Sequence, residues 1–272
     1  MTTHSNSSDR SSSQAGAAPR DPAVRPPTSS VYSARSSIDS RTYYFDSKTW
    51  LFPGVTLPLR SMLVVTGEQE EILISPVCTP EEALQVGAPL TLVSPSAFHH
   101  RHHRRAGHHH NFAVAIERYR PLAVWGPPGL AEDLQELNAL EFVGPVHVFG
   151  IDAWPYSDQL EFVVVEGAPQ HGEVVFFHRT SRTIYTADLF FNIQDPEGFL
   201  ASLVFRWMGI YRRFAIPKIW HRWVTDRAAF ARSIDQILGW DFDRIVVAHG
   251  DVVDQDARAL VETALRELRA LA

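Results

Sequence analysis

One stretch of this sequence, Leu92 to His110 (LVSPSAFHHRHHRRAGHHH), limits the choice of fold more than any other. The apolar run Leu90 to Val93 has the length of a buried strand and ends just before Pro95. Upstream, Glu71 to Ser75 predicts another strand. Thr79-Pro80-Glu81-Glu82 between them predicts a helix start, with an N-cap threonine and a proline at the first position. This strand–helix–strand unit places the histidines that follow at a strand's carboxyl end, where ligands bind in open α/β sheets.

The remaining elements follow from hydrophobic periodicity and turn signals. Ser61 to Val65 and Glu71 to Ser75 flank Gly67-Glu68 and predict a hairpin. Further strands are predicted over residues 122–125, 146–150, 160–165, 173–177, 183–186 and 244–247, and the third to fifth of these form an antiparallel meander. Helices are predicted over residues 112–119, 198–208, 226–238 and 256–270. This order predicts an α/β protein of the α+β type, with two mixed sheets face to face and helices outside, a four-layer αββα sandwich.

Composition excludes several classes of protein. A net charge of −6 and a pI near 6.1 provide no basic surface for non-specific nucleic-acid binding. The single cysteine, Cys78, excludes an intramolecular disulfide framework and favours a reducing compartment. No apolar run reaches the length of a membrane span, and no secretory signal is evident, so we expect a cytoplasmic protein without an integral membrane segment.

Residues 1–40 differ from the rest because they are rich in Ser, Pro and Arg and almost lack large apolar side chains. Such a segment buries too little surface to offset its ordering entropy, so we expect a disordered tail before a domain over residues 41–272. A transit peptide is the alternative, although Asp9, Asp21 and Asp39 argue against it.

Four short strings occur in a fixed order: ILISPV (72–77), PSAFHH (95–100), TADLFFN (186–192) and VVAHGD (246–251). Together they resemble the metallo-β-lactamase superfamily over roughly Ser61 to Leu268. The chain is most similar to a poorly characterised branch of that superfamily, a domain family of unknown function. The resemblance implies the αββα sandwich and a metal-dependent hydrolase-like activity.

The same resemblance implies that the first of the two usual metal sites is missing. The superfamily motif HxHxDH, laid over PSAFHH, puts Pro95 and Ala97 where the first-metal histidines stand. The third-motif histidine falls close to Pro169. His171 lies two residues further on, would face the same way on an extended chain, and is a reserve ligand.

The second site keeps its ligands. The alignment places His99 and His100 at the end of the HxHxDH motif, which is the second motif of the superfamily, and it matches Asp188 and His249 to the fourth and fifth motifs. Three imidazoles and one carboxylate suit one divalent metal, zinc first, or iron or manganese if waters complete six positions. Asp188 would be a metal ligand or would orient the reacting water, and the substrate would be a small molecule that the sequence does not identify.

Three alternatives remain open at the level of sequence. A non-catalytic binding protein would keep the fold without the metal, with His249 in the core and Asp188 capping a turn. The histidines of the following loop predict weak metal scavenging at a surface rather than a second site; they are His102, His103, His108, His109 and His110. The basic and aromatic segment from Arg206 to Trp223 predicts a packed helix pair with solvated charges, a substrate lid, or a patch that touches a membrane.

Overall fold

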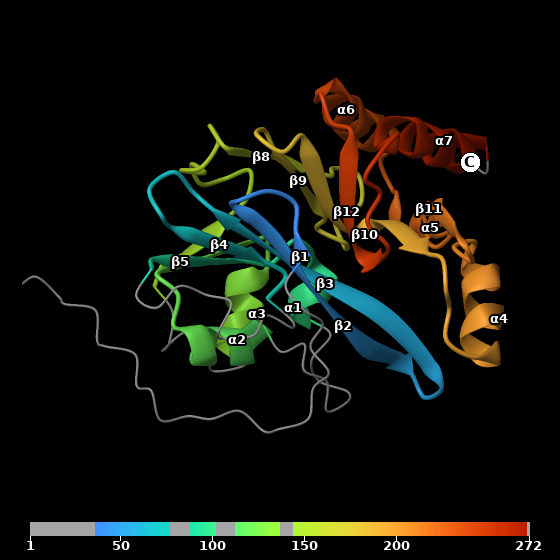
Figure 1. The fold of residues 1–272 in the computed structure, drawn as a ribbon, viewed down its shortest axis with the longest axis horizontal. Coiled ribbons are helices and arrows are strands. Elements are labelled where there is room, and N and C mark those ends of the chain that lie inside the picture. The colour runs from blue at the N-terminus through green and yellow to red at the C-terminus, as the bar shows by residue number, and fades with distance from the viewer. Residues whose placement is uncertain (1–35, 77–87, 102–111, 137–143, 271–272) are drawn as a thin grey trace, which may run out of the picture. The chain divides into compact units, whose positions relative to one another are not determined.

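A seven-stranded mixed sheet forms the N-terminal half of the fold (Figure 1). Its order is β1-β2-β3-β4-β5-β6-β7, antiparallel from β1 to β4 and parallel from β4 to β7. The strands are β1 (Ser36–Ser37), β2 (Thr42–Phe52), β3 (Val55–Val65), β4 (Glu71–Ile74), β5 (Leu90–Val93), β6 (Ala123–Gly126) and β7 (Val146–Val148). The β3–β4 hairpin and the strand at 90–93 are therefore where the sequence predicts them.

The computed structural model describes residues 36–76, 88–101, 112–136 and 144–270. The predicted helix start at Thr79, Cys78, the loop histidines from His102 to His110 and most of the predicted tail lie outside these residues. Strand β1 falls within the range predicted as tail and pairs with β2.

The second sheet is built from the C-terminal half of the chain. Its order is β11-β10-β9-β8, with β12 added in parallel to β10. The strands are β8 (Leu160–Val164), β9 (Val174–His178), β10 (Thr183–Ile193), β11 (Arg213–Ala215) and β12 (Arg244–Gly250). The predicted meander is confirmed, because β8, β9 and β10 pair antiparallel.

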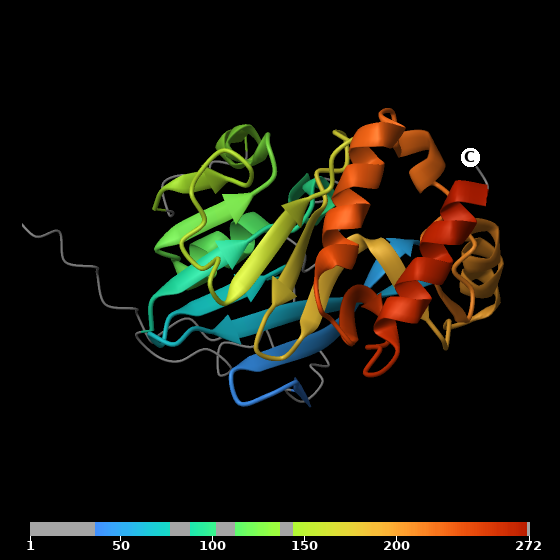
Figure 2. The same cartoon turned by 90° about the horizontal axis from the view of Figure 1, so that it is seen from above.

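Helices cover the outer faces of both sheets (Figures 1 and 2). They are α1 (Ala97–Arg101), α2 (Phe112–Tyr119), α3 (Leu130–Glu136), α4 (Phe199–Met208), α5 (Trp220–Trp223), α6 (Arg227–Gly239) and α7 (Ala257–Ala270). Among the helices that the structure describes, none combines the length and apolar composition needed to span a bilayer.

Alternating side chains of the buried strands separate the layers. In β4, Leu73 points to the core shared with α2 and α3, whereas Ile72 and Ile74 point to the core between the sheets. That inner core also contains Phe176 and Val246 of the second sheet. The outer face of the second sheet packs on α6 and α7. The predicted αββα sandwich is thus confirmed.

Strand β10 is longer and less regular than the sequence predicts. The predicted strand ends at Thr186, but β10 continues to Ile193. Thr186 pairs with Val247 and Phe191 pairs with His249, so residues 187–190 of β10 lie opposite the single residue Ala248 of β12. These extra residues form a bulge, which bends a strand and re-aims its side chains.

Helix α4 forms where the sequence predicts a helix, and its predicted apolar stripe is only partly buried. The stripe consists of Phe199, Leu200, Leu203, Val204, Trp207 and Met208. Val204 and Met208 pack against a core that includes Val55 of β3, whereas Phe199, Leu203 and Trp207 are exposed. The fully buried residues of α4 are Ala201 and Phe205, which lie outside that stripe.

The buried His178 predicts acid sensitivity of the fold. Burial lowers the pKa of this imidazole, against the attraction of Asp39. A histidine in the unfolded chain has a pKa of about 6.5, so as pH falls it binds a proton before the buried His178 does. The free energy of unfolding should therefore fall as pH drops below that value. His178→Gln should reduce this slope in urea denaturation between pH 7 and 5. An unchanged slope would show that other titratable groups cause the loss of stability at low pH.

Candidate metal centre

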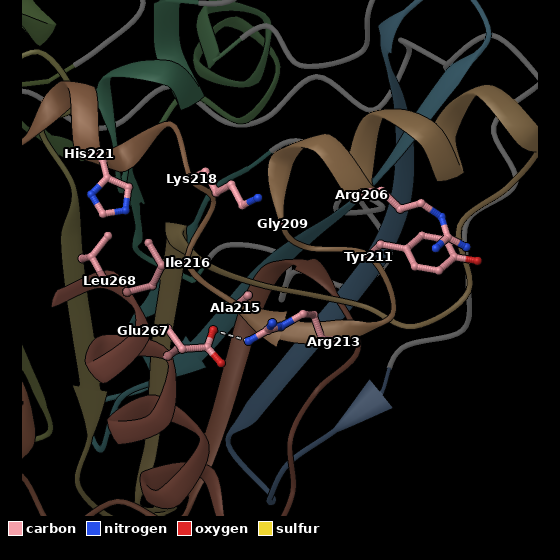
Figure 3. Close-up of a pocket in the computed structure, with 11 residues that line it drawn as sticks. Arg206, Gly209, Tyr211, Arg213, Ala215, Ile216, Lys218, His221, Glu267 and Leu268 are labelled. Atoms are coloured by element: carbon pink, nitrogen blue, oxygen red, sulfur yellow. Dashed lines mark hydrogen bonds and ion pairs between the residues drawn. The ribbon is translucent and has the colours of Figure 1, made fainter. Parts of the chain in front are cut away.

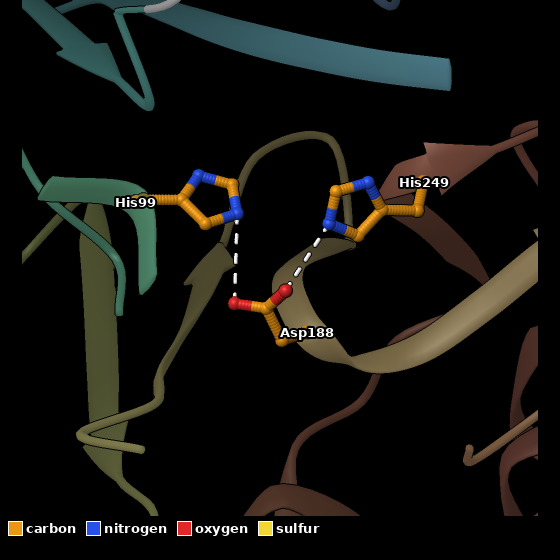
Figure 4. A group of neighbouring side chains, drawn as sticks. All are labelled: His99, Asp188 and His249. Carbon is orange, nitrogen blue, oxygen red and sulfur yellow. Dashed lines mark hydrogen bonds and ion pairs between the residues drawn. The ribbon is translucent and has the colours of Figure 1, made fainter. Parts of the chain in front are cut away.

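The bulge in β10 directs Asp188 toward three imidazoles. Its Oδ1 lies 3.1 Å from Nε2 of His249, and its Oδ2 lies 3.6 Å from Nε2 of His99 and 3.9 Å from Nε2 of His171. Ser96 donates its hydroxyl hydrogen to the same Oδ2 at 2.6 Å. Figure 4 shows the rings of His99 and His249 pointing at the carboxylate from opposite sides. Asp188 is therefore the common neighbour of four side chains, which come from three segments of the chain.

Glu173 holds the bulge in place. Residues 187–189 lack regular strand partners for their N–H groups, and the Glu173 carboxylate accepts from all three, at 2.9–3.3 Å. The side chain is completely buried at the start of β9. Because buried backbone N–H groups need acceptors, this carboxylate fixes the backbone that carries Asp188. This role of Glu173 is not predicted from the sequence, although an acidic residue that opens the apolar run EVVFF is a usable signal.

In each of the two closest imidazoles, the ring nitrogen that does not face Asp188 has a hydrogen-bond partner that orients the ring. Nδ1 of His249 donates to the carbonyl oxygen of Pro58 at 2.9 Å, and Nδ1 of His99 lies 2.6 Å from the hydroxyl of Ser75. A carbonyl only accepts, so Nδ1 of His249 carries a proton and Nε2 is the ring nitrogen that faces the Asp188 oxygen. Two acceptors 3.1 Å apart need a proton or a cation between them. Outward-bonded Nδ1 atoms of this kind are typical of metal-ligating histidines.

His171 completes an aromatic wall beside the carboxylate. Its ring stacks on the ring of Trp223, with 4.7 Å between the ring centroids, and lies edge to face with Trp220, with 4.3 Å between the centroids. Although it is buried, neither ring nitrogen has a hydrogen-bond partner among the described residues. Burial lowers the pKa of His171 to about 4, so the ring is neutral near pH 7 despite the attraction of Asp188. A buried unsatisfied nitrogen is costly and calls for a ligand that the protein itself does not provide.

Two glycines explain why His171 reaches the centre although the alignment puts the expected histidine at Pro169. Gly167 and Gly172 have positive φ angles of 78° and 60° and bend the segment on both sides of His171. A Cβ at Gly172 would stand 2.8 Å from Pro127, so a side chain is excluded there. The carbonyl of His171 accepts from the N–H of Ala97 at 2.8 Å, which ties the turn to α1.

The two buried carboxyl groups of the centre, Asp188 and Glu173, have pKa values shifted in opposite directions. Burial alone would raise the pKa of Asp188, but His99, His249 and His171 outweigh it and hold that pKa below its ordinary value. Burial and the neighbouring Asp188 raise the pKa of Glu173, against the backbone hydrogen bonds that it accepts. The Asp188 carboxylate thus carries the negative charge that faces the imidazoles.

The residues fit a divalent cation. Ligand atoms of His99, Asp188 and His249 all lie within 4.8 Å of one another. Two atoms that are each about 2.1 Å from a tetrahedral ion stand about 3.4 Å apart. The observed separations are 3.1 Å from Oδ1 of Asp188 to Nε2 of His249 and 3.6 Å from Oδ2 of Asp188 to Nε2 of His99, both close to that value but measured from different oxygens.

A second set, His171, Glu173 and Asp188, meets the same distance criterion. It suits a cation less well because the oxygens of Glu173 already accept the backbone bonds of the bulge. The first set is therefore the better candidate.

Solved structures similar to this chain have one fold in common. The flavodiiron core of Flv1 from Synechocystis sp. PCC6803 superimposes with a TM-score of 0.57 and 14% identity, over 87% of this chain and 60% of that chain. A metallo-beta-lactamase from Pontibacter korlensis gives 0.54 and 18%, over 87% and 98% of the two chains. The DIM-1 metallo-beta-lactamase gives 0.56 and 13%, over 88% and 97%. The chain has the metallo-β-lactamase fold.

These neighbours establish the fold and not the reaction, because their sequences are so different. The chain spans 60% of the flavodiiron core that it matches. No protein-family model matches the sequence, and a comparison with curated protein sequences gives no match.

Within the metallo-β-lactamase fold, three of the four predicted ligands come together. His99 follows β5 in α1, Asp188 lies in the β10 bulge and His249 ends β12. Asp188 lies two residues beyond the end of the predicted strand 183–186, but inside the longer observed strand β10. His100 belongs to α1, and its side chain lies outside the described part of the structure.

The positions aligned with the first-metal histidines have other roles. Pro95 accepts a backbone hydrogen bond from Val174 at 2.8 Å, which links the loop after β5 to β9. Ala97 is buried at the start of α1. Neither side chain has a ligand atom, and between them Ser96 contacts Asp188.

Proposed function

We propose that this chain is a metal-dependent hydrolase that uses a single divalent cation, held by His99, Asp188 and His249 with His100 as the fourth ligand. One observation carries the proposal. The Nε2 atoms of His99 and His249 converge on the Asp188 carboxylate while Pro58 and Ser75 engage their Nδ1 atoms. Three imidazoles and one carboxylate favour zinc, and iron or manganese would need additional water ligands.

A bound cation of this kind lowers the pKa of a coordinated water from about 16 toward 7 and so supplies hydroxide at neutral pH. The chain's own groups prepare the site. Ser96 holds Oδ2 of Asp188 in a fixed direction, and Glu173 fixes the backbone behind it. His171 contributes a neutral ring whose Nε2 lies 3.9 Å from that oxygen. Trp220 and Trp223 exclude water from that ring.

The alternative, a binding protein that keeps the fold without metal chemistry, predicts ligand atoms scattered by more than about 5 Å, since zinc bonds are about 2 Å long. The three described ligands lie within 4.8 Å of one another, and their rings are oriented toward one carboxylate. These facts support the hydrolase proposal over that alternative.

Metal content of purified, untagged protein tests the proposal. We expect about one equivalent of zinc in the wild type and almost none in His249→Ala, because that change removes one of four ligands. His147→Ala is the matched control, because His147 stacks on Trp125 away from the centre. The His147→Ala protein should therefore bind as much zinc as the wild type. Equal, near-zero occupancy in wild type and His249→Ala would overturn the proposal.

The histidine-rich loop is predicted to bind metal weakly, and this metal must not be counted as metal of the centre. The measurement is therefore repeated in a background in which serine replaces His102, His103, His108, His109 and His110. The protein that retains zinc is then assayed with generic esterase and phosphodiesterase substrates, with His249→Ala as the blank. Zinc bound without turnover of either class would favour the binding protein.

A further inference from the structure

Helix α4 exposes an apolar face that no described residue covers. Phe199, Leu203 and Trp207 recur every fourth position and are 85%, 54% and 71% exposed, and Leu200 beside them is 42% exposed. We call these four residues the α4 face. Figure 1 places α4 at the edge of the fold, outside the two sheets. Contiguous exposed apolar side chains of this size mark an interaction site rather than an ordinary surface.

The segment that carries this face is strongly basic. Residues 198–225 contain five arginines and lysines and no aspartate or glutamate, in a chain whose net charge is −6. Arg206 follows Leu203 by three positions and so borders the α4 face. Its guanidinium lies 3.8 Å from the ring centre of Tyr211, which holds it beside the helix. The apolar face therefore has a positively charged border toward the C-terminal end of α4, whereas Asp195 and Glu197 precede its N-terminal end and pair with Arg212 and Lys48.

A cavity of about 520 Å³ opens beside α4 (Figure 3). Arg206, Arg213 and Lys218 line it together with His221, and apolar residues such as Ile216 complete its wall. Arg213 is paired with Glu267, whereas no carboxylate pairs with Lys218 or Arg206 among the described residues. The metal-centre residues do not line this cavity. It offers net positive charge to an anion at the border of the α4 face.

We propose that the α4 face and this basic cavity dock on an anionic phospholipid bilayer. Aromatic and leucine side chains enter the boundary between headgroups and acyl chains, while Arg206, Arg212 and Lys218 meet lipid phosphates. A flat bilayer accommodates a convex helix that presents apolar side chains at successive turns.

A second copy of the chain is a poorer occupant. A two-fold interface places the same patch against itself, so it would bring the two basic segments together and oppose like charges. Nucleic acid is disfavoured because the most exposed side chains of the face are apolar.

Vesicle co-sedimentation of the full chain tests the proposal. We expect binding to phosphatidylcholine vesicles containing about one-third phosphatidylglycerol, weak binding to pure phosphatidylcholine, and release as salt rises toward about 0.5 M. Trp207→Ser should lower the partition coefficient about tenfold. Ile151→Ser is its control, because Ile151 is 76% exposed on another part of the fold.

Charge reversal provides a second, independent pair of variants. Arg212→Glu should reduce binding to anionic vesicles, and Arg232→Glu on α6 should not, although both arginines are more than half exposed. Equal binding to neutral and anionic vesicles would overturn the proposal, as would equal loss in Trp207→Ser and Ile151→Ser. A dimer in light scattering that Trp207→Ser dissociates, without vesicle binding, would assign the face to a second copy.

Discussion

Asp188→Asn is expected to lower zinc affinity by at least about 100-fold and hydrolysis by about 1000-fold while leaving the fold intact. Asparagine matches the shape of aspartate. Its amide oxygen accepts from Ser96, and its amide nitrogen donates to Nε2 of His249, which is an acceptor because Nδ1 donates to Pro58. The substitution therefore removes only the negative charge of this ligand.

Competition with a chromophoric chelator measures the affinity, and thermal unfolding of metal-free protein checks the fold. Asp152→Asn is the matched control, because its carboxylate accepts a backbone hydrogen bond from Val148 outside the centre. Unchanged zinc affinity in Asp188→Asn would remove Asp188 from the ligand set. A large fall in the melting temperature of the metal-free variant would assign Asp188 a structural role.

Glu173→Ala is expected to lower the free energy of unfolding by about 3–5 kcal/mol. The substitution leaves three buried N–H groups without their acceptor and opens a space at the start of β9. Urea denaturation of the metal-free protein measures the change. Glu161→Ala on the neighbouring strand β8 is the control, because its partly exposed ion pair with Arg179 contributes at most about 1 kcal/mol.

Glu173→Gln separates positioning from stability. Glutamine keeps one acceptor oxygen for the bulge but lacks the second, so we expect a folded protein with zinc affinity reduced about tenfold. If Glu173→Ala costs less than about 1 kcal/mol, the bulge does not depend on this carboxylate. If Glu173→Gln binds zinc as the wild type does, Glu173 stabilises the strand without positioning Asp188.

Local signals were sufficient for most of the fold. The helix at Phe112–Tyr119 has the predicted bounds, and Asp226 accepts from the N–H of Ala229 as an N-cap should. The hairpin of β3 and β4 and the meander of β8 to β10 were also predicted. Each of these elements depends on residues close together in sequence, whose periodicity and capping are visible without the partner element.

The missed features depend on partners far away in sequence. The β10 bulge exists because Glu173 replaces strand partners for residues 187–189, and no pattern within TADLFF reveals that. His171 is predicted only as a reserve ligand, and its place beside Asp188 depends on two glycines with positive φ that bend its segment. The exposure of Phe199, Leu203 and Trp207 on α4 was not predicted, because helical periodicity identifies an apolar stripe but not whether a neighbour covers it.

The ligands of the proposed centre come from opposite layers of the sandwich. His99 follows the last residues of β5 in the first sheet, whereas Asp188 and His249 belong to the second. A cation bound by all three would cross-link the two sheets at their shared edge. Free metal at 1000 times its dissociation constant would then add about 4 kcal/mol against separation of the layers. Metal supply would thereby govern how long the folded protein survives, even when no substrate is present.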